Sequence, residues 1–188
     1  MLCLSLFLDI GMEITFAGWI SSFSLLQGVS SKEEATIYPA IFWGVMTIFR
    51  FLLAFLPGRS SQKLRRLIEA TMLVAGLSLV LIGFGLVEFT CYLSSVLLGI
   101  SLSSLYPLMF SIVTEFGWRL DKDQTNNIVA AGVLGEGILA MLAGLLMGHF
   151  GDTMLFWSII GFALLMWAFI YSATRRLKNV PVPADVMV

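Results

Sequence analysis

Charge and histidine are scarce in this sequence. Only 12% of its 188 residues are Asp, Glu, Lys or Arg, and it has one histidine. A soluble domain carries about 25% charged residues, so this chain has too little charge to cover a water-exposed globule. The lone histidine excludes multi-histidine metal motifs, and no glycine-rich phosphate loop is present. We therefore expect no enzyme activity, no metal site and no resident cofactor.

The chain also lacks a strongly basic character. Its 11 basic and 12 acidic residues give a net charge of −1, which excludes the positive field that neutralises nucleic-acid phosphates. Cys3 and Cys91 both lie in apolar runs, where a thiol behaves as a small hydrophobe. We therefore exclude nucleic acid as a partner, and the cysteines carry no information on the redox compartment.

Apolar residues are abundant, at 59% of the chain, and the mean hydropathy is +0.94. A helix needs about 20 residues to cross about 30 Å of hydrocarbon. Six apolar runs of about this length are separated by charged or turn segments, with Gly83, Gly85 and Glu88 marking the shortest separation. They lie near residues 3–27, 36–57, 67–87, 90–114, 128–149 and 154–173. This pattern predicts an all-α, polytopic membrane protein with six transmembrane helices and the lipid bilayer as its partner.

The basic residues are distributed unequally between alternate loops. The loops on one side of the membrane hold nine basic residues: Arg59, Lys63, Arg65, Arg66, Arg119, Lys122, Arg175, Arg176 and Lys178. The loops on the other side hold only Lys32. Basic residues of short loops stay in the cytoplasm. We therefore predict that both termini are cytoplasmic, with residues 1–175 forming one helical bundle and residues 176–188 a cytoplasmic tail.

Two acids stand in the first predicted span. Asp9 and Glu13 are four residues apart and Ser5 precedes them by one turn, so all three occupy one helical stripe. A charged side chain at mid-bilayer costs about 2.5–3.5 kcal/mol, so this stripe cannot face lipid. Asp9 and Glu13 are candidates for binding solute or a coupling cation, either H⁺ or Na⁺. The alternative is an ion pair with a base on another helix.

A third acid, Glu136, lies near the middle of the fifth predicted span, which contains no base to neutralise it. We expect it to face an internal cavity and to contact solute or ion. In the alternative, Glu136 only hydrogen-bonds a neighbour while the glycines around it serve packing. Farther along the span, Gly144 and Gly148 are spaced for close helix packing.

The second predicted span carries a base. Arg50 shares a helical face with Thr47 and Trp43, so a guanidinium, a hydroxyl and an aromatic ring form one stripe. A sugar or an organic anion could bind to this set. Alternatively, Arg50 clamps a carboxylate such as Glu69 or Glu115 and closes the cytoplasmic side.

Pro107 interrupts the fourth predicted span. It removes a backbone hydrogen bond and predicts a kink, and Ser101, Ser103 and Ser104 are near enough to satisfy the freed groups. A kinked span rich in hydroxyl groups is common beside a transport pathway, so Pro107 is a candidate gating residue.

These features resemble the C-terminal half of a major facilitator superfamily transporter. The similar branch includes the fucose permease and the sodium-dependent glucose transporter-like proteins. The likeness runs from about residue 5 to about residue 175. It rests on the seventh, eighth, tenth and eleventh spans of that branch, through Gly11, Glu13, Gly18 and Trp19; Phe42, Trp43 and Arg50; Gly99, Ser104, Pro107 and Glu115; and Gly135 and Glu136.

The resemblance implies secondary active transport of a small polar solute, most simply a sugar moved by symport through alternating access. Glu13 and Glu136 would then contact solute or ion, and Trp43 would offer a stacking surface. Arg50 and Glu115 would serve solute contact or cytoplasmic gating.

Transporters of this kind are two six-span halves packed around a site at the membrane midplane. This chain supplies one half, so we expect a second half, a second copy or a longer protein. Two other functions remain open at this point. One is a non-transporting half that regulates a full-length transporter, and the other is a proton-coupled exporter of drugs or organic anions.

Overall fold

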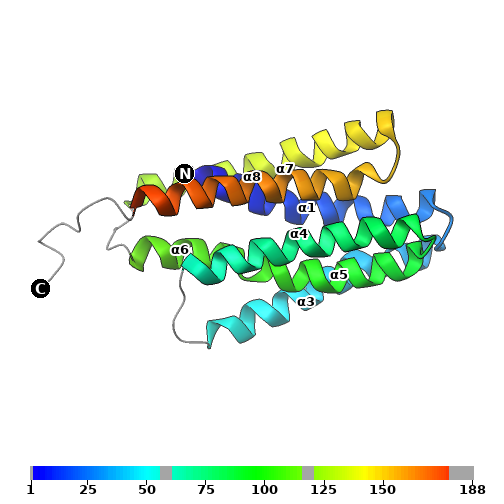
Figure 1. The fold of residues 1–188 in the computed structure, drawn as a ribbon, viewed down its shortest axis with the longest axis horizontal. Coiled ribbons are helices and arrows are strands. Elements are labelled where there is room, and N and C mark those ends of the chain that lie inside the picture. The colour runs from blue at the N-terminus through cyan, green and yellow to red at the C-terminus, as the bar shows by residue number, and fades with distance from the viewer. Residues whose placement is uncertain (1, 56–60, 116–120, 178–188) are drawn as a thin grey trace, which may run out of the picture.

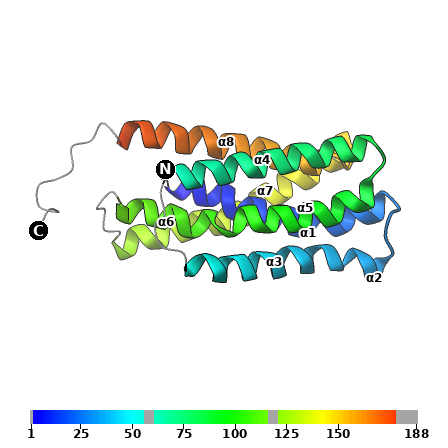
Figure 2. The same ribbon diagram turned by 60° about the horizontal axis from the view of Figure 1, so that its bottom comes forward.

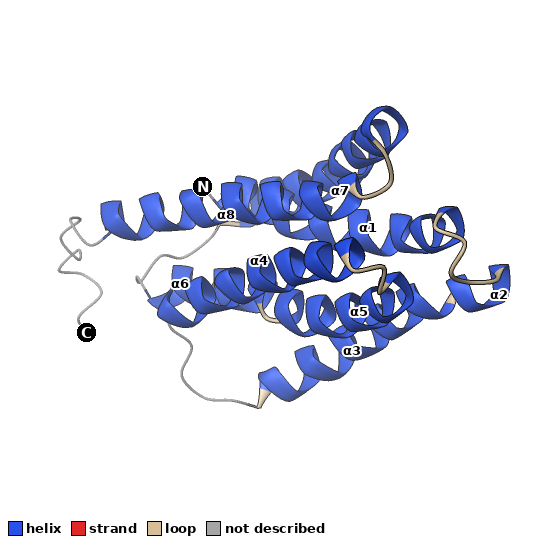
Figure 3. Cartoon of the chain, turned by 45° about the vertical axis from the view of Figure 1, so that its right-hand side comes forward, coloured by secondary structure: helices blue, strands red, loops and turns tan. Residues whose placement is uncertain are grey.

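The computed structural model describes residues 2–55, 61–115 and 121–177, which are helical with short connections and contain no β-strand (Figures 1 and 3). Six stretches in the described part are long and apolar enough to cross a membrane, which confirms the predicted all-α fold with six spans. The helices are α1 (Leu2–Leu26), α2 (Lys32–Ala35), α3 (Ile37–Ala54), α4 (Ser61–Gly83), α5 (Val87–Ser103), α6 (Leu105–Glu115), α7 (Lys122–Phe150) and α8 (Met154–Leu177).

The long helices form one elongated bundle, and α1 begins at the same end at which α8 ends (Figure 1). Helix α1 is central because it packs against α7, α8, α3 and α5. Its side chains Leu6, Met12, Phe16, Ile20 and Phe23 are fully buried. Helix α3 lies at an outer edge in two views of the bundle (Figures 1 and 2) and packs mainly against α5. Groups on the inner side of α3 therefore face α5 or α1.

The shortest predicted turn is present between α4 and α5. Helix α4 ends at Gly83 and α5 begins at Val87. Gly85 has a φ of +76°, which glycine adopts without a steric penalty, and the Leu86 N–H donates to the Leu81 carbonyl at 3.0 Å. The chain therefore reverses over residues 84–86, while Glu88 lies in the first turn of α5.

Helix α7 begins before the apolar run that predicts it. The Asp121 carboxylate accepts a hydrogen bond from the Lys122 N–H at 2.7 Å, and the Gln124 side chain accepts one from the Asp121 N–H at 3.3 Å. These reciprocal bonds satisfy N–H groups that a helix start leaves free. The helix therefore starts at its capping residues rather than at the edge of the hydrocarbon.

The fourth span is interrupted where Pro107 predicts a kink. A proline ring clashes with the carbonyl four residues earlier, and that residue, Ser103, is the last of α5. The Ser103 and Ser104 hydroxyls donate to the carbonyls of Ile100 and Ser101 at 2.6 and 3.4 Å. Hydroxyl groups thus bond to the backbone at the break, and the chain resumes as α6.

Helices α1 and α7 approach each other at backbone distance. A Cβ added at Gly135 would collide with the backbone carbonyl of Phe7, and one added at Gly11 would collide with the side chain of Leu139. Both glycines are buried. Small residues permit this close approach in membrane bundles, where van der Waals contact drives association.

We expect Gly135→Ala to lower the free energy of unfolding by about 1–3 kcal/mol, because the added methyl group overpacks this interface. Thermal unfolding of the purified chain in detergent micelles measures the change. Gly137→Ala is the matched control, since open space surrounds Gly137 on the same helix. Equal stability of the two variants would show that α1 and α7 do not approach this closely.

Candidate functional site

The acidic stripe of the first span lies inside the bundle. Ser5, Asp9 and Glu13 on α1 are all buried, and Asp9 has no exposed surface. Their spacing of four residues keeps them on one face of α1. The bundle thus removes two carboxyl groups from lipid, as their cost in hydrocarbon requires.

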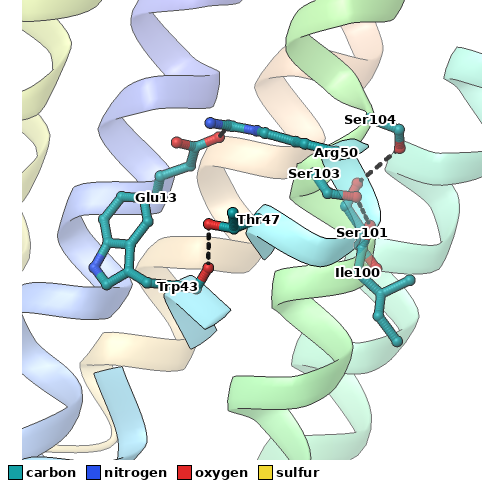
Figure 4. A network of polar contacts seen from close by, with 8 residues as sticks. All are labelled: Glu13, Trp43, Thr47, Arg50, Ile100, Ser101, Ser103 and Ser104. Carbon is teal, nitrogen blue, oxygen red and sulfur yellow. Dashed lines mark hydrogen bonds and ion pairs between the residues drawn. The ribbon is translucent and has the colours of Figure 1, made fainter. Parts of the chain in front are cut away.

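Glu13 forms an ion pair with Arg50 that joins α1 to α3. The Arg50 Nη2 donates to the Glu13 Oε1, and Figure 4 shows the guanidinium extending from α3 to the carboxylate. The Glu13 side chain is 6% exposed and the Arg50 side chain 37% exposed. The Arg50 Nε is buried with no hydrogen-bond partner among the described residues. Sequence reasoning left open an ion pair for Glu13, and Arg50 is its base.

Asp9 is the most isolated polar group of the cluster. Both of its carboxyl oxygens are buried, and neither has a hydrogen-bond partner in the described part of the chain. Its charge interacts with those of Glu13 and Arg50. A buried carboxylate without a hydrogen bond is costly, whereas a protonated carboxyl or a bound cation removes that cost. Asp9 is therefore suited to hold a proton or a small cation.

Glu136 belongs to the same neighbourhood. It lies on α7, is half-buried and is near enough to Glu13 for their charges to interact. Because α1 and α7 touch through glycines, a carboxylate on α7 comes near the acids of α1 without a long side chain between them. The structure thus brings Asp9, Glu13, Arg50 and Glu136 together, and we call these four residues the acid–arginine cluster.

Trp43 and Thr47 lie on α3 below Arg50 (Figure 4). The Trp43 side chain is partly exposed and its ring makes an edge contact with Phe42 at 5.3 Å between centroids. The Thr47 hydroxyl donates to the Trp43 carbonyl at 2.8 Å. The hydroxyl proton is therefore used within α3, and the indole ring is the group available for stacking.

Two other acids, Glu69 and Glu115, are predicted as alternative partners of Arg50. Glu69 is not that partner, because its carboxylate accepts from the Arg65 Nε at 2.8 Å within α4. Glu115 ends α6, and its side chain lies outside the described residues. Pro107 stands in the first turn of α6, next to the break in the span.

A functional contact that sequence reasoning missed involves Trp19. Its Nε1 donates to the Ala140 carbonyl at 2.9 Å, and its ring covers Gly144 so closely that a Cβ there would collide with it. Gly144 is thus a packing residue, and the G-W pair of the first span was a usable signal. That Gly148 also packs closely stays a prediction: Gly148 is exposed in this bundle, and no neighbouring atom of the described residues lies within 4 Å of a Cβ built there.

No group of three or more His, Cys, Asp or Glu side chains in the described ranges could hold a metal ion. The cluster instead combines three carboxyl groups with one guanidinium, so acid exceeds base. It can bind a proton or the hydroxyl groups of a neutral solute, and a cation such as Na⁺ would need further ligands besides these carboxyl groups.

Comparison with known proteins finds relatives among transporters. The chain is 27% identical over 144 residues, 76% of its length, to the major facilitator superfamily domain-containing protein 4A of Mus musculus, of which it covers 28%. It is 24% identical over 198 aligned positions, 98% of its length, to the sodium-dependent glucose transporter 1A of Mus musculus, of which it covers 43%. No family model and no solved structure matches.

The chain therefore spans less than half the length of either of these relatives. The resemblance to one half of a major facilitator superfamily transporter is confirmed by these two relatives, one named for the superfamily and the other named as a transporter. Neither relative bears the name of an enzyme, in agreement with the absence of catalytic motifs in the sequence.

The acid–arginine cluster makes a testable prediction about stability. We expect Arg50→Gln to destabilise the bundle by about 3 kcal/mol, because it leaves the buried Glu13 carboxylate without its base. The double variant Glu13→Gln/Arg50→Gln should recover most of that loss. Thermal unfolding in detergent micelles measures both.

Glu69→Gln is the control for this cycle, since the exposed Arg65–Glu69 pair should contribute less than about 1 kcal/mol. If the losses of unfolding free energy in Glu13→Gln and Arg50→Gln simply add in the double variant, the two side chains do not interact.

Proposed function

We propose, from this resemblance, that the chain forms one half of a secondary active transporter that moves a small polar solute by alternating access. The observation that carries the proposal is the acid–arginine cluster, which lies on three membrane-spanning helices, α1, α3 and α7. Ionisable groups at such depth mark substrate and ion pathways in membrane proteins.

The exposed part of the acid–arginine cluster supports the presence of a second six-helix half of the transporter. Arg50 and Trp43 are each 37% exposed on a helix that spans the membrane. A guanidinium in contact with lipid is costly, so this face requires water or protein against it. A second six-helix bundle packed on α3 and α7 would cover the face and enclose a pathway, as in two-half transporters. The second bundle would be the rest of a longer chain, another copy or a related protein.

The excess of acids in the acid–arginine cluster favours some solute classes over others. Three acids accompany one base, and that base is already paired with Glu13. An organic anion would meet excess negative charge, whereas a neutral solute would find acceptors for its hydroxyl groups and an indole ring at Trp43. A sugar presents both hydroxyl groups and an apolar ring face. The name of one relative, a glucose transporter, favours the same solute class.

The same proposal assigns roles to the individual residues. Asp9 would carry the coupling H⁺ or Na⁺, and Glu136 would contact solute or ion. Arg50 would exchange between Glu13 and the solute, so that solute binding weakens the tie between α1 and α3. Pro107, at the break in the fourth span, and Glu115 would take part in gating.

Uptake by proteoliposomes that contain the purified chain, alone and together with any longer relative with which it co-purifies, tests the proposal. We expect labelled glucose to enter under an inward Na⁺ or H⁺ gradient, and Glu136→Gln to lower the rate at least about tenfold by removing a charged contact to the solute or ion. Glu33→Gln is the matched control, because Glu33 is an exposed acid of α2.

Competition separates the alternatives in the same assay. Unlabelled hexoses should compete, and the sugar assignment fails if only apolar cations do. Absence of uptake by the wild-type chain, both alone and reconstituted with a longer relative with which it co-purifies, would contradict transport by this chain and indicate a regulatory half.

We also infer that both termini are cytoplasmic, and the two native cysteines make this easy to test. In a background with Cys3→Ala and Cys91→Ala, an impermeant maleimide added to intact cells should label Glu33→Cys, which is exposed at the end of the bundle with few basic residues. It should label Asp123→Cys, at the basic end, only after permeabilisation. The reverse pattern would invert the assigned orientation.

A further inference from the structure

Two arginines and two aromatic rings meet where the start of α4 lies beside the end of α8. Trp167 and Tyr171 stack with ring centroids 5.4 Å apart and planes 12° from parallel. The Arg65 guanidinium lies 5.9 Å from the Trp167 ring and 5.6 Å from the Tyr171 ring. The Arg175 guanidinium lies 4.6 Å from the Tyr171 ring. We call these four residues the arginine–aromatic cluster.

This cluster lies at the boundary of the hydrocarbon. Arg65 begins the apolar stretch Arg65–Gly83, and Tyr171 stands one residue before the end of the stretch Met154–Ser172. Two views show α4 and α8 running side by side to this end (Figures 1 and 2), in agreement with their packing. Tyrosine and tryptophan are enriched at the level of lipid headgroups.

The membrane face beside the cluster is apolar. On α4, Leu73 and Leu77 are 74% and 47% exposed, and on α8, Leu165 is 52% exposed. The acid–arginine cluster is carried instead by α1, α3 and α7, so a second half that covers it would not need α4 and α8. Lipid chains are therefore the expected neighbours of this apolar face.

The cluster has an excess of positive charge. Arg65 is paired with Glu69 at 2.8 Å, and this pair is half-exposed. Within the described ranges, Arg175 forms no ion pair, so the two arginines of the cluster face one acid. Contact with an aromatic ring restricts the motion of a guanidinium through cation–π attraction and stacking. The arginine side chains therefore lose less conformational entropy when they bind an anion.

We propose that the arginine–aromatic cluster binds the headgroup phosphate of an anionic glycerophospholipid. A guanidinium matches a phosphate group with parallel N–H donors. The acyl chains of such a lipid would lie along the exposed leucines of α4 and α8. This is also the end that the basic loops predict to be cytoplasmic, where the membrane leaflet carries its anionic lipids.

Native mass spectrometry of the purified full chain in detergent tests this with phosphatidylserine and phosphatidylcholine as probes. We expect one phosphatidylserine to be retained in preference to phosphatidylcholine. Arg65→Gln/Arg175→Gln should weaken its retention about thirty-fold, about fivefold for each guanidinium that no longer contacts the phosphate.

Arg66→Gln/Lys122→Gln is the charge-matched control, because it removes two exposed bases from the same end and leaves the ring contacts intact. We expect this control to keep phosphatidylserine binding within about threefold of wild type. Equal loss from both double variants would overturn the proposal, since net charge alone would then explain the binding.

Two further measurements distinguish guanidinium geometry from charge and a lipid from a soluble anion. Arg65→Lys/Arg175→Lys keeps the charge and removes the planar guanidinium, so it should show an intermediate loss while circular dichroism reports unchanged helix content. Millimolar inorganic phosphate should not displace the lipid. Displacement by phosphate would overturn the lipid assignment, because the occupant would then be a soluble anion.

Discussion

The ion pair between Glu13 and Arg50 is the interaction on which the arrangement of the bundle depends. Each group alone would be costly at this depth, and together they fix α3 against α1. Helix α3 also packs on α5 and buries Tyr38, Phe42 and Met46, and the pair adds a charged contact to α1 on this inward side. The pair also sets the position of Trp43, which shares the helix with Arg50. The ion pair therefore joins the acids of α1 to the aromatic ring of α3 in one polar face.

Backbone contact between α1 and α7 complements this charge pairing. The ion pair holds one flank of α1 through side chains that can exchange partners, whereas glycines and the Trp19–Ala140 bond hold the other flank closely. One flank of α1 is thus adjustable and the other stiff. In a two-half transporter, such a bundle would move as a rigid unit while its charged contacts rearrange.

The sequence predicts the spans well because hydrophobic length is a local property, and it places Asp9, Glu13 and Arg50 at depth for the same reason. It does not predict that Glu13 rather than Glu69 pairs with Arg50, because that choice depends on how α1 packs against α3. The Trp19–Ala140 bond joins residues 121 positions apart, so no local pattern contains it. Early helix starts, such as that of α7 at Lys122 after its cap Asp121, could have been read from the capping pattern.

The wide separation of α1 and α7 along the chain has a consequence for biogenesis. Helices enter the membrane in order of synthesis, so α1 arrives with two carboxyl groups and no base. Arg50 reaches it with the next span, but Gly135 and Ala140 follow only with the fifth. Until then, the α7-facing flank of α1 is open to other proteins. A nascent chain would therefore gain from an insertion factor that shields this flank between the second and the fifth span.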